Sequence, residues 1–272
     1  MGCLPEIVCF GAQKSGTSWL FSNVVQNPGV WEPPLKEMHF FNYLPGRSGW
    51  IVSGHKQRLS RRRASCIAKA DKAGADHAAS LLRYPMMTEE WYRAAYAPCP
   101  QDLKTIDVTP AYALLDSSGH DRMEKLLGKY FKGIFLVRDP VGRAISAIRG
   151  SVSKNGQPPR THDDWMNAFR SPPVTKRNDY SSVIKKLDHH LGERVLYLPF
   201  GRIRRDPVGV LRDIEDHCDL PAGDYKSADR PRHESLKFPM PDSVAEVIRE
   251  KLEVQYNFLI LRFGREFCSV MT

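Results

Sequence analysis

The chain has 272 residues, 42% of them hydrophobic and 26% charged, and this composition excludes a largely disordered protein. Its longest apolar runs, among them residues 134–137 and 258–261, are far shorter than the ~20 residues that a membrane-spanning helix needs. Lys and Arg number 40 against 31 Asp and Glu, and the resulting charge of +9 favours a polyanionic partner. The six cysteines include no C-x-x-C pair, so we expect reduced thiols and no metal site.

Short apolar runs alternate with helical patterns along the chain. We predict helices that begin at Thr17 or Ser18, at Pro140, at Tyr180, at Pro207 and at Asp242, the last one extending to Leu259, and a further helix that ends within residues 126–130. The predicted strands are residues 7–10, 30–31, 106–108, 133–137 and 195–198. This alternation is typical of an α/β fold in which helices flank a central parallel sheet, and ligands bind such sheets at the carboxyl ends of the strands.

Residues 51–83 differ from their surroundings, because they are rich in Ala, Lys and Arg and contain few large apolar side chains. We predict one or two exposed helices here, with the triplet Arg61-Arg62-Arg63 near the centre. The segment is either a solvated helical excursion, or a lid over a bound substrate or a basic surface for an anionic substrate or membrane. The triplet alone does not decide between these interpretations.

The first predicted strand runs directly into a glycine-containing loop at residues 11–19. A strand, such a loop and a helix start together aim several backbone N–H groups at one point, which makes an anion site. Gly11 and Gly16 have the spacing of the ATP-binding G-x-x-x-x-G-K-[ST] pattern, but Thr17 stands where that pattern needs lysine, and the lysine comes earlier, at Lys14. We therefore expect phosphate binding without ATP or GTP hydrolysis; the alternative is a turn that only joins strand to helix.

A second motif, Arg138-Asp139-Pro140, follows the strand at residues 133–137. An arginine at the carboxyl end of a buried parallel strand lies where ligands bind, and its planar guanidinium suits a phosphate. Proline is favourable at the first helical position, so Ser146 lies about two turns into the next helix, where its hydroxyl can meet the same phosphate. The alternative is that Arg138 pairs with Asp139 as a structural cap.

Together the two motifs resemble those of the sulfotransferases that use 3′-phosphoadenosine 5′-phosphosulfate (PAPS). Residues 13–19 are similar to the family's 5′-phosphosulfate loop, and residues 136–146 are similar to its 3′-phosphate segment. Residues 36–41 (K-E-M-H-F-F) and 109–112 (T-P-A-Y) resemble segments of the glycan-modifying branch, which includes heparan sulfate sulfotransferases. The resemblance implies a P-loop-NTPase-like three-layer fold and a single sulfotransferase domain over the whole chain, with a basic helical insertion at about residues 46–88.

The resemblance also implies what individual residues do. Sulfuryl transfer in this family is an in-line displacement, and the resemblance implies that Lys14 stabilises the negative charge on the leaving phosphate. Glu37 is the expected general base, and His39 is its rival because the small-molecule branch of the family uses a histidine. The residues expected to bind the donor in these two motifs are Gln13, Lys14, Ser15, Gly16, Thr17, Ser18, Trp19, Arg138 and Ser146.

Two segments depart from the family pattern. Glycan-branch enzymes often carry Glu-Lys before T-P-x-Y, whereas this chain has Asp107-Val108, so an acidic role stays open to Asp107 but the lysine is missing. The C-terminal cofactor loop is only loosely similar, with Arg230, Arg232 and Lys237 in the matching region. We assign Arg232 and Lys237 to the cofactor and favour Lys237; the alternative is a solvated basic loop.

We therefore expect a transferase that moves a sulfuryl group from PAPS to a hydroxyl or amine of a small molecule or saccharide, releasing adenosine 3′,5′-bisphosphate. An ATP-dependent kinase of related fold is the first alternative, against which Thr17 argues. A non-catalytic polyanion-binding protein is the second, but no aromatic residues interleave with the basic run at 56–63, so we expect no nucleic-acid partner. Residues 1–6 form no basic secretory segment, which leads us to expect a cytoplasmic enzyme.

Overall fold

A computed structural model describes residues 3–155, 157–230 and 238–272. At its centre is a sheet of five parallel strands in the order β2-β3-β1-β4-β5. Each strand lies within two residues of its predicted bounds, and the largest difference is at the strand predicted over 106–108, which begins at the polar Lys104. The strands are β1 (Ile7–Gly11), β2 (Val30–Trp31), β3 (Lys104–Val108), β4 (Lys132–Val137) and β5 (Val195–Pro199).

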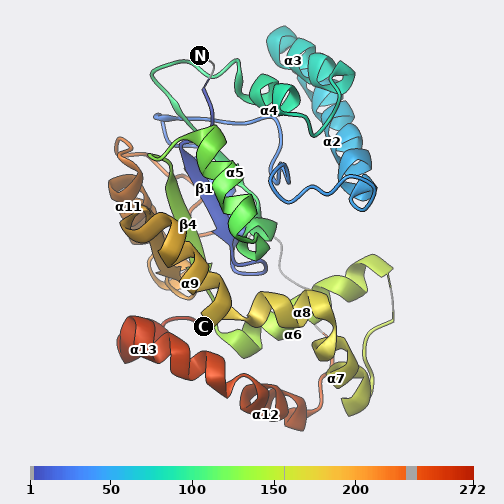
Figure 1. Ribbon diagram of the computed structural model, residues 1–272, viewed down its shortest axis with the longest axis vertical. Helices are drawn as coiled ribbons and strands as arrows, with labels where there is room; N and C mark the ends of the chain where they lie inside the picture. The colour runs from blue at the N-terminus through green and yellow to red at the C-terminus, as the bar shows by residue number, and fades with distance from the viewer. Residues whose placement is uncertain (1–2, 156, 231–237) are drawn as a thin grey trace.

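Helices connect the strands and cover both faces of the sheet (Figure 1). Several begin at a side chain that accepts the N–H three residues further on, and these caps are Asp71, Thr88, Asp116, Thr161, Asp179 and Asp206. The helices are α1 (Thr17–Val24), α2 (Gly49–Ala68), α3 (Lys72–Arg83), α4 (Glu89–Tyr96), η1 (Pro110–Leu114), α5 (Ser117–Leu127), α6 (Pro140–Asn155), α7 (His162–Arg170), α8 (Pro172–Asn178), α9 (Tyr180–Leu191), η2 (Gly192–Arg194), α10 (Arg202–Arg205), α11 (Pro207–Cys218), α12 (Asp242–Lys251) and α13 (Glu253–Ser269).

The alternation of side chains along β1 explains the three layers. Ile7 and Cys9 pack with α1 and α11 on one face, whereas Val8 and Phe10 point to the opposite face, which α5 and α9 cover. Both faces of the sheet are therefore buried at its centre, which is why residues 7–10 of β1 and 134–137 of β4 are continuous apolar runs. The predicted α/β fold with a P-loop-like three-layer arrangement is confirmed.

The segment predicted to be helical at residues 51–83 forms two helices, α2 and α3, which pack against each other at one end of the molecule (Figure 1). Leu59 and Leu81 are buried, while Arg61 and Arg63 are exposed, so the pair has one apolar and one basic side. Among the helices that the structure describes, none is long and apolar enough to cross a membrane.

The C-terminal helical pattern was predicted as one helix to Leu259, and this is wrong. The chain leaves helical geometry at Leu252, which separates α12 from α13. Val244 and Ile248 of α12 pack against α6 and α7, whereas Leu259 of α13 packs in the core cluster on the α9 face of the sheet. One straight helix cannot bury side chains in both clusters. Val247, at a position predicted to face the core, is only partly buried.

Candidate active site

The loop after β1, hereafter the cradle, lies at the carboxyl edge of the sheet and has the backbone geometry expected of an anion site. Gly16 has a φ of +88°, and a Cβ at this position would lie 2.7 Å from Cδ1 of Ile203, so a side chain does not fit here. Helix α1 begins directly behind Gly16 with no side-chain cap from the described residues. The N–H groups of Thr17, Ser18 and Trp19 therefore lack intrahelical acceptors and, with the helix dipole, favour a bound anion.

Arg138 closes the other side of this cradle. Because β1 and β4 are neighbours, the segments that follow them emerge at the same edge of the sheet. Nη1 of Arg138 donates to the backbone oxygen of Lys14 at 2.5 Å, and its guanidinium lies 4.5 Å from the centre of the Phe200 ring. The buried hydroxyl of Tyr180 accepts from the N–H of Arg138 at 3.2 Å and donates to its carbonyl at 2.8 Å. The structure thus brings the two predicted motifs together.

Asp139 has a separate structural role. Its carboxylate accepts from the N–H of Gly142 at 2.7 Å and from the hydroxyl of Tyr256 at 2.5 Å, so it caps α6 while Arg138 bonds to the loop. Four residues into α6, the buried Arg143 bonds to the side chain of Asn178 and ties α6 to α8. Burial lowers the pKa of Arg143 to about 10, and the group still carries its charge at neutral pH.

The side chain of Lys14 reaches from the loop to helix α6. A Cβ placed on Gly150 would lie 2.8 Å from Nζ of Lys14, so the ammonium group packs against the helix at this glycine. Ser146 is buried one turn earlier on the same helix. Lys14 and Ser146, which lie more than 130 residues apart in the sequence, therefore belong to one site.

Residues 36–41, hereafter the strap, carry Glu37 and His39 past the end of β3. Both residues have left-handed backbone, with φ of 60° and 55°, a conformation that costs a non-glycine residue about 1–3 kcal/mol. Neighbouring groups hold it in place: Glu37 N–H donates to the carbonyl of Val108 at 3.1 Å, and His39 N–H donates to Oγ1 of Thr109 at 3.4 Å. The directions of the two side chains are thus set by the end of the sheet.

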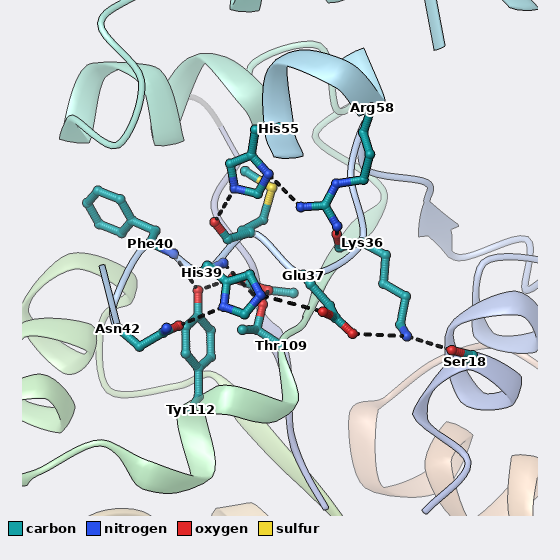
Figure 2. Close-up of polar contacts among 12 residues, drawn as sticks. Ser18, Lys36, Glu37, His39, Phe40, Asn42, His55, Arg58, Thr109 and Tyr112 are labelled. Atoms are coloured by element: carbon teal, nitrogen blue, oxygen red, sulfur yellow. Dashed lines mark hydrogen bonds and ion pairs between the residues drawn. The ribbon is translucent and has the colours of Figure 1, made fainter. Parts of the chain in front are cut away.

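A row of polar side chains links the strap to the loop (Figure 2). Nζ of Lys36 donates to Oγ of Ser18 at 2.7 Å and lies 3.5 Å from Oε1 of Glu37. Oε2 of Glu37 lies 3.5 Å from Nε2 of His39, whose Nδ1 is 3.2 Å from Oδ1 of Asn42. Burial raises the pKa of Glu37, but the hydrogen bond with His39 and the charge of Lys36 outweigh it, and the pKa falls to about 2. Glu37 is therefore ionised at neutral pH.

Asp107 lies buried beneath the strap and supports it. The hydroxyls of Thr109, Tyr92 and Tyr112 donate to its carboxylate at 2.6, 3.0 and 2.9 Å. The hydroxyls of Thr109 and Tyr112 also accept the N–H groups of His39 and Phe40 in the strap. The carboxylate therefore fixes two hydroxyls that in turn fix the backbone of the strap. Burial raises the pKa of Asp107. Val108, at the position where the glycan branch often has lysine, is buried in the core.

A family model described as the sulfotransferase family matches residues 5–224. The chain belongs to the sulfotransferase family. Among solved structures, the sulfotransferase from Alicyclobacillus acidocaldarius is similar, with a TM-score of 0.67 and 20% identity over 98% of this chain and 99% of that one. The sulfotransferase domain from the curacin biosynthetic pathway gives a TM-score of 0.52 and 15% identity over 93% of this chain and 99% of that one. No curated protein sequence matches the chain.

The predicted donor-loop residues of this sulfotransferase are not all equally accessible. Gln13 is exposed, Ser15 and Thr17 are buried, and Lys14, Gly16 and Ser18 are partly exposed. The ring of Trp19 packs in the core, and its Nε1 donates to the carbonyl of Ala228 at 2.7 Å. Trp19 therefore offers the cradle only its backbone N–H. Arg232 and Lys237 lie outside the described residues.

Three residues of the sulfotransferase site were not predicted. Tyr180 fixes the backbone of Arg138, and the only sequence signal for it was its place at the start of a helical pattern. Lys36 places an ammonium group beside Glu37, and it was visible as the first residue of the K-E-M-H-F-F segment. Trp50, 66% exposed, meets the ring of His39 edge-on at 5.4 Å between ring centres, and no motif marked it.

Proposed function

We propose that this sulfotransferase moves the sulfuryl group of PAPS to a hydroxyl or amine of its acceptor, with Glu37 as the general base. The observation that carries the proposal is the row from the anion cradle to the base. Ser18 lies 2.7 Å from Lys36, and Lys36 lies 3.5 Å from Glu37. Glu37 is thus separated from the cradle only by Lys36 in this row. A base at this position is suited to taking the proton from an acceptor hydroxyl that attacks an anion bound in the cradle.

The cradle fits a donor that carries phosphate at two positions. The free N–H groups at the start of α1 and the ammonium of Lys14 suit the 5′-phosphosulfate, and Arg138 with Ser146 suits the 3′-phosphate. The absence of a side chain at Gly16, where a Cβ would meet Cδ1 of Ile203 at 2.7 Å, lets the loop backbone lie close to α10. PAPS supplies an activated sulfuryl group on a phosphate leaving group.

Glu37, Lys14 and Lys36 each have a task in the transfer. Glu37 takes the proton of the attacking hydroxyl, a contribution of typically ~10²–10⁴-fold to the rate. Lys14 stabilises the charge that develops on the leaving phosphate. Lys36 contacts both Ser18 of the loop and Glu37 of the strap. An anionic donor bound beside Lys36 weakens the attraction between Lys36 and Glu37 and places a second negative charge near Glu37. Both effects raise the pKa of Glu37 from about 2 toward the range of a working base.

The resemblance of residues 36–41 and 109–112 to the glycan-modifying branch favours a saccharide hydroxyl as acceptor. We also propose that residues 1–272 form one sulfotransferase domain, in which residues 46–88, including α2 and α3, are an insertion relative to the family pattern.

Thermal unfolding with nucleotide ligands tests the donor site. Adenosine 3′,5′-bisphosphate at ~100 times its Kd stabilises a protein by ~2.7 kcal/mol, and we expect a shift of Tm with this ligand and none with ATP–Mg²⁺. A shift with ATP–Mg²⁺ alone would make the site a kinase site and overturn the proposal.

Transfer itself is measured with ³⁵S-labelled PAPS and a panel of a phenol (2-naphthol) and an N-acetylglucosamine oligosaccharide. Lys14→Ala is expected to abolish labelling of the acceptor, because it removes the ammonium group that we assign to the charge on the leaving phosphate. Lys69→Ala, at an exposed position beyond α2, removes the same charge and serves as the control. Near-normal transfer by Lys14→Ala contradicts the assigned role.

A further inference from the structure

Helix α2 contacts the backbone of the strap from the side opposite Thr109 (Figure 2). Nε2 of His55 donates to the carbonyl of Met38 at 2.8 Å, and Nη1 of Arg58 donates to the carbonyl of Lys36 at 3.4 Å. These two carbonyls belong to the residues on either side of Glu37. The strap is therefore held from both sides, by the end of β3 and by α2.

His55 and Arg58 act as one unit. Nη2 of Arg58 lies 2.7 Å from Nδ1 of His55, and a guanidinium only donates, so Nδ1 accepts and Nε2 carries the proton. His55 is fully buried and stacks on Trp91, with ring centres 5.3 Å apart and planes at 18°. Burial lowers the pKa of His55 to about 4, which keeps the ring neutral and able to accept from Arg58 at neutral pH.

The same arginine also acts on Glu37 through its charge. Besides burial, which raises it, the pKa of Glu37 responds to several cations, and the positive charge of Arg58 is one that lowers it. The charged and titratable groups that face Glu37 are Lys36 and His39 of the strap, His55 and Arg58 of α2, and Arg177 of α8. His55 and Arg58 both bond to the backbone next to Glu37, and Arg58 differs from His55 because its positive charge also lowers the pKa of the carboxylate.

We propose that Arg58 is a positioning residue for the general base. Through its own guanidinium and through His55, which it orients, it holds the carbonyls of Lys36 and Met38 and so keeps Glu37 in the left-handed conformation that faces the donor loop. The inference rests on the proposed function, because Glu37 is the base only in that reaction. It gives part of the segment 46–88 a role that is neither a lid nor a basic docking surface.

Hydrogen–deuterium exchange tests the contact without any acceptor. Arg58→Met is expected to speed exchange in peptides covering residues 36–41 by about five- to tenfold, the effect of losing roughly one net hydrogen bond, while residues 11–19 keep their protection. Arg61→Met removes the same charge from an exposed position on the same helix and is expected to change neither. Wild-type protection of the strap in Arg58→Met overturns the inference.

His55→Phe provides a second variant should Arg58→Met fail to fold. Phenylalanine keeps the stack on Trp91 but removes the hydrogen bond to Met38, and the exchange of residues 36–41 is expected to rise as in Arg58→Met. Unchanged exchange in this variant likewise counts against the inference.

The pH profile of kcat separates positioning from a merely structural role, using whichever panel acceptor the wild-type enzyme sulfates. Arg58→Met is expected to lower kcat by roughly 10²-fold while adenosine 3′,5′-bisphosphate binds as before, and to move the acid limb to higher pH because a cation near Glu37 is lost. Arg58→Lys keeps the charge, so its acid limb stays in place while kcat remains below wild type.

The outcomes distinguish the two proposals. A wild-type enzyme that sulfates no panel acceptor counts against the proposed function, and the exchange experiment still decides whether Arg58 holds the strap. An active wild-type enzyme whose Arg58→Met variant keeps both kcat and acid limb counts against Arg58 alone.

Discussion

Oε2 of Glu37 lies 3.5 Å from Nε2 of His39, and the surroundings of the two side chains differ in how well each can accept a proton from an acceptor. Both ring nitrogens of His39 already face a partner, Asn42 at Nδ1 and Glu37 at Nε2, and the residue is only 6% exposed. The side chain of Glu37 is 35% exposed, and its Oε1 faces Lys36 and the donor loop. We therefore expect an incoming hydroxyl to reach Glu37 before His39, and we expect His39 to orient the carboxylate.

The two roles predict different losses. Glu37→Gln is expected to lower kcat by ~10²–10⁴-fold, because the amide cannot take a proton, while binding of adenosine 3′,5′-bisphosphate is unchanged. His39→Ala is expected to lose less, since the carboxylate remains. Glu32→Gln makes the same change at an exposed position five residues earlier and serves as the control. A greater loss in His39→Ala than in Glu37→Gln would assign the base to His39.

At this scale the sequence predicts residues whose signal is local. Lys14 and Arg138 follow from short motifs next to predicted strands, and Glu37 from a six-residue resemblance. The contacts that complete the site join residues far apart in the chain, as between Lys36 and Ser18 or between Arg58 and Lys36. No local pattern contains such pairs, because tertiary folding alone brings them together.

At the scale of elements, the end of β4 and the start of α9 form one unit around Arg138. The hydroxyl of Tyr180 satisfies both backbone groups of Arg138, and the guanidinium is then free to bond to the loop. Without that hydroxyl, the partly buried N–H and carbonyl of Arg138 lose a partner, and the direction of the arginine is less well fixed.

Tyr180→Phe is therefore expected to lower the free energy of unfolding by about 1–3 kcal/mol and to weaken binding of adenosine 3′,5′-bisphosphate. Urea unfolding and ligand titration measure the two effects. The matched control is Tyr197→Phe. It removes a hydroxyl that donates to Oδ1 of Asp188 at 2.9 Å, and neither of these two residues belongs to the two motifs. This control is expected to lose stability only, and equal binding in both variants contradicts the role of Tyr180.

Element prediction succeeded where burial is simple. Residues 7–10 and 134–137 of the two central strands are fully buried, and their continuous apolar runs identify them as strands of a parallel sheet. The helix over residues 242–259 was mispredicted because its apolar positions serve two separate clusters, and a pattern on one chain does not show which cluster each side chain joins.

At the scale of the whole molecule, a buried carboxylate joins two segments that lie nearly 190 residues apart in the chain. Glu215 of α11 accepts from Asn27 at 3.0 Å, from the N–H of Gly223 at 2.7 Å, and from Tyr225 and Arg212 at 2.6 Å each. Asn27 follows α1, so this carboxylate fixes the turn that leads away from the donor-loop helix. Burial raises the pKa of Glu215, but these hydrogen bonds outweigh it and the pKa is lowered.

A lowered pKa in the folded state means that the folded protein binds fewer protons than the unfolded chain. Glu215 therefore contributes stability above its unfolded pKa, ~4.3, and loses that contribution as the pH falls through the folded value. Glu215→Gln is expected to be less stable than wild type at pH 7 and to approach it as the pH falls below about 4, because only wild type has this contribution to lose. Urea midpoints at pH 7, 5, 4 and 3 measure the difference, with Glu193→Gln, at an exposed position, as the control. A constant gap between Glu215→Gln and wild type across this range contradicts the linkage and leaves only a packing role for the carboxylate.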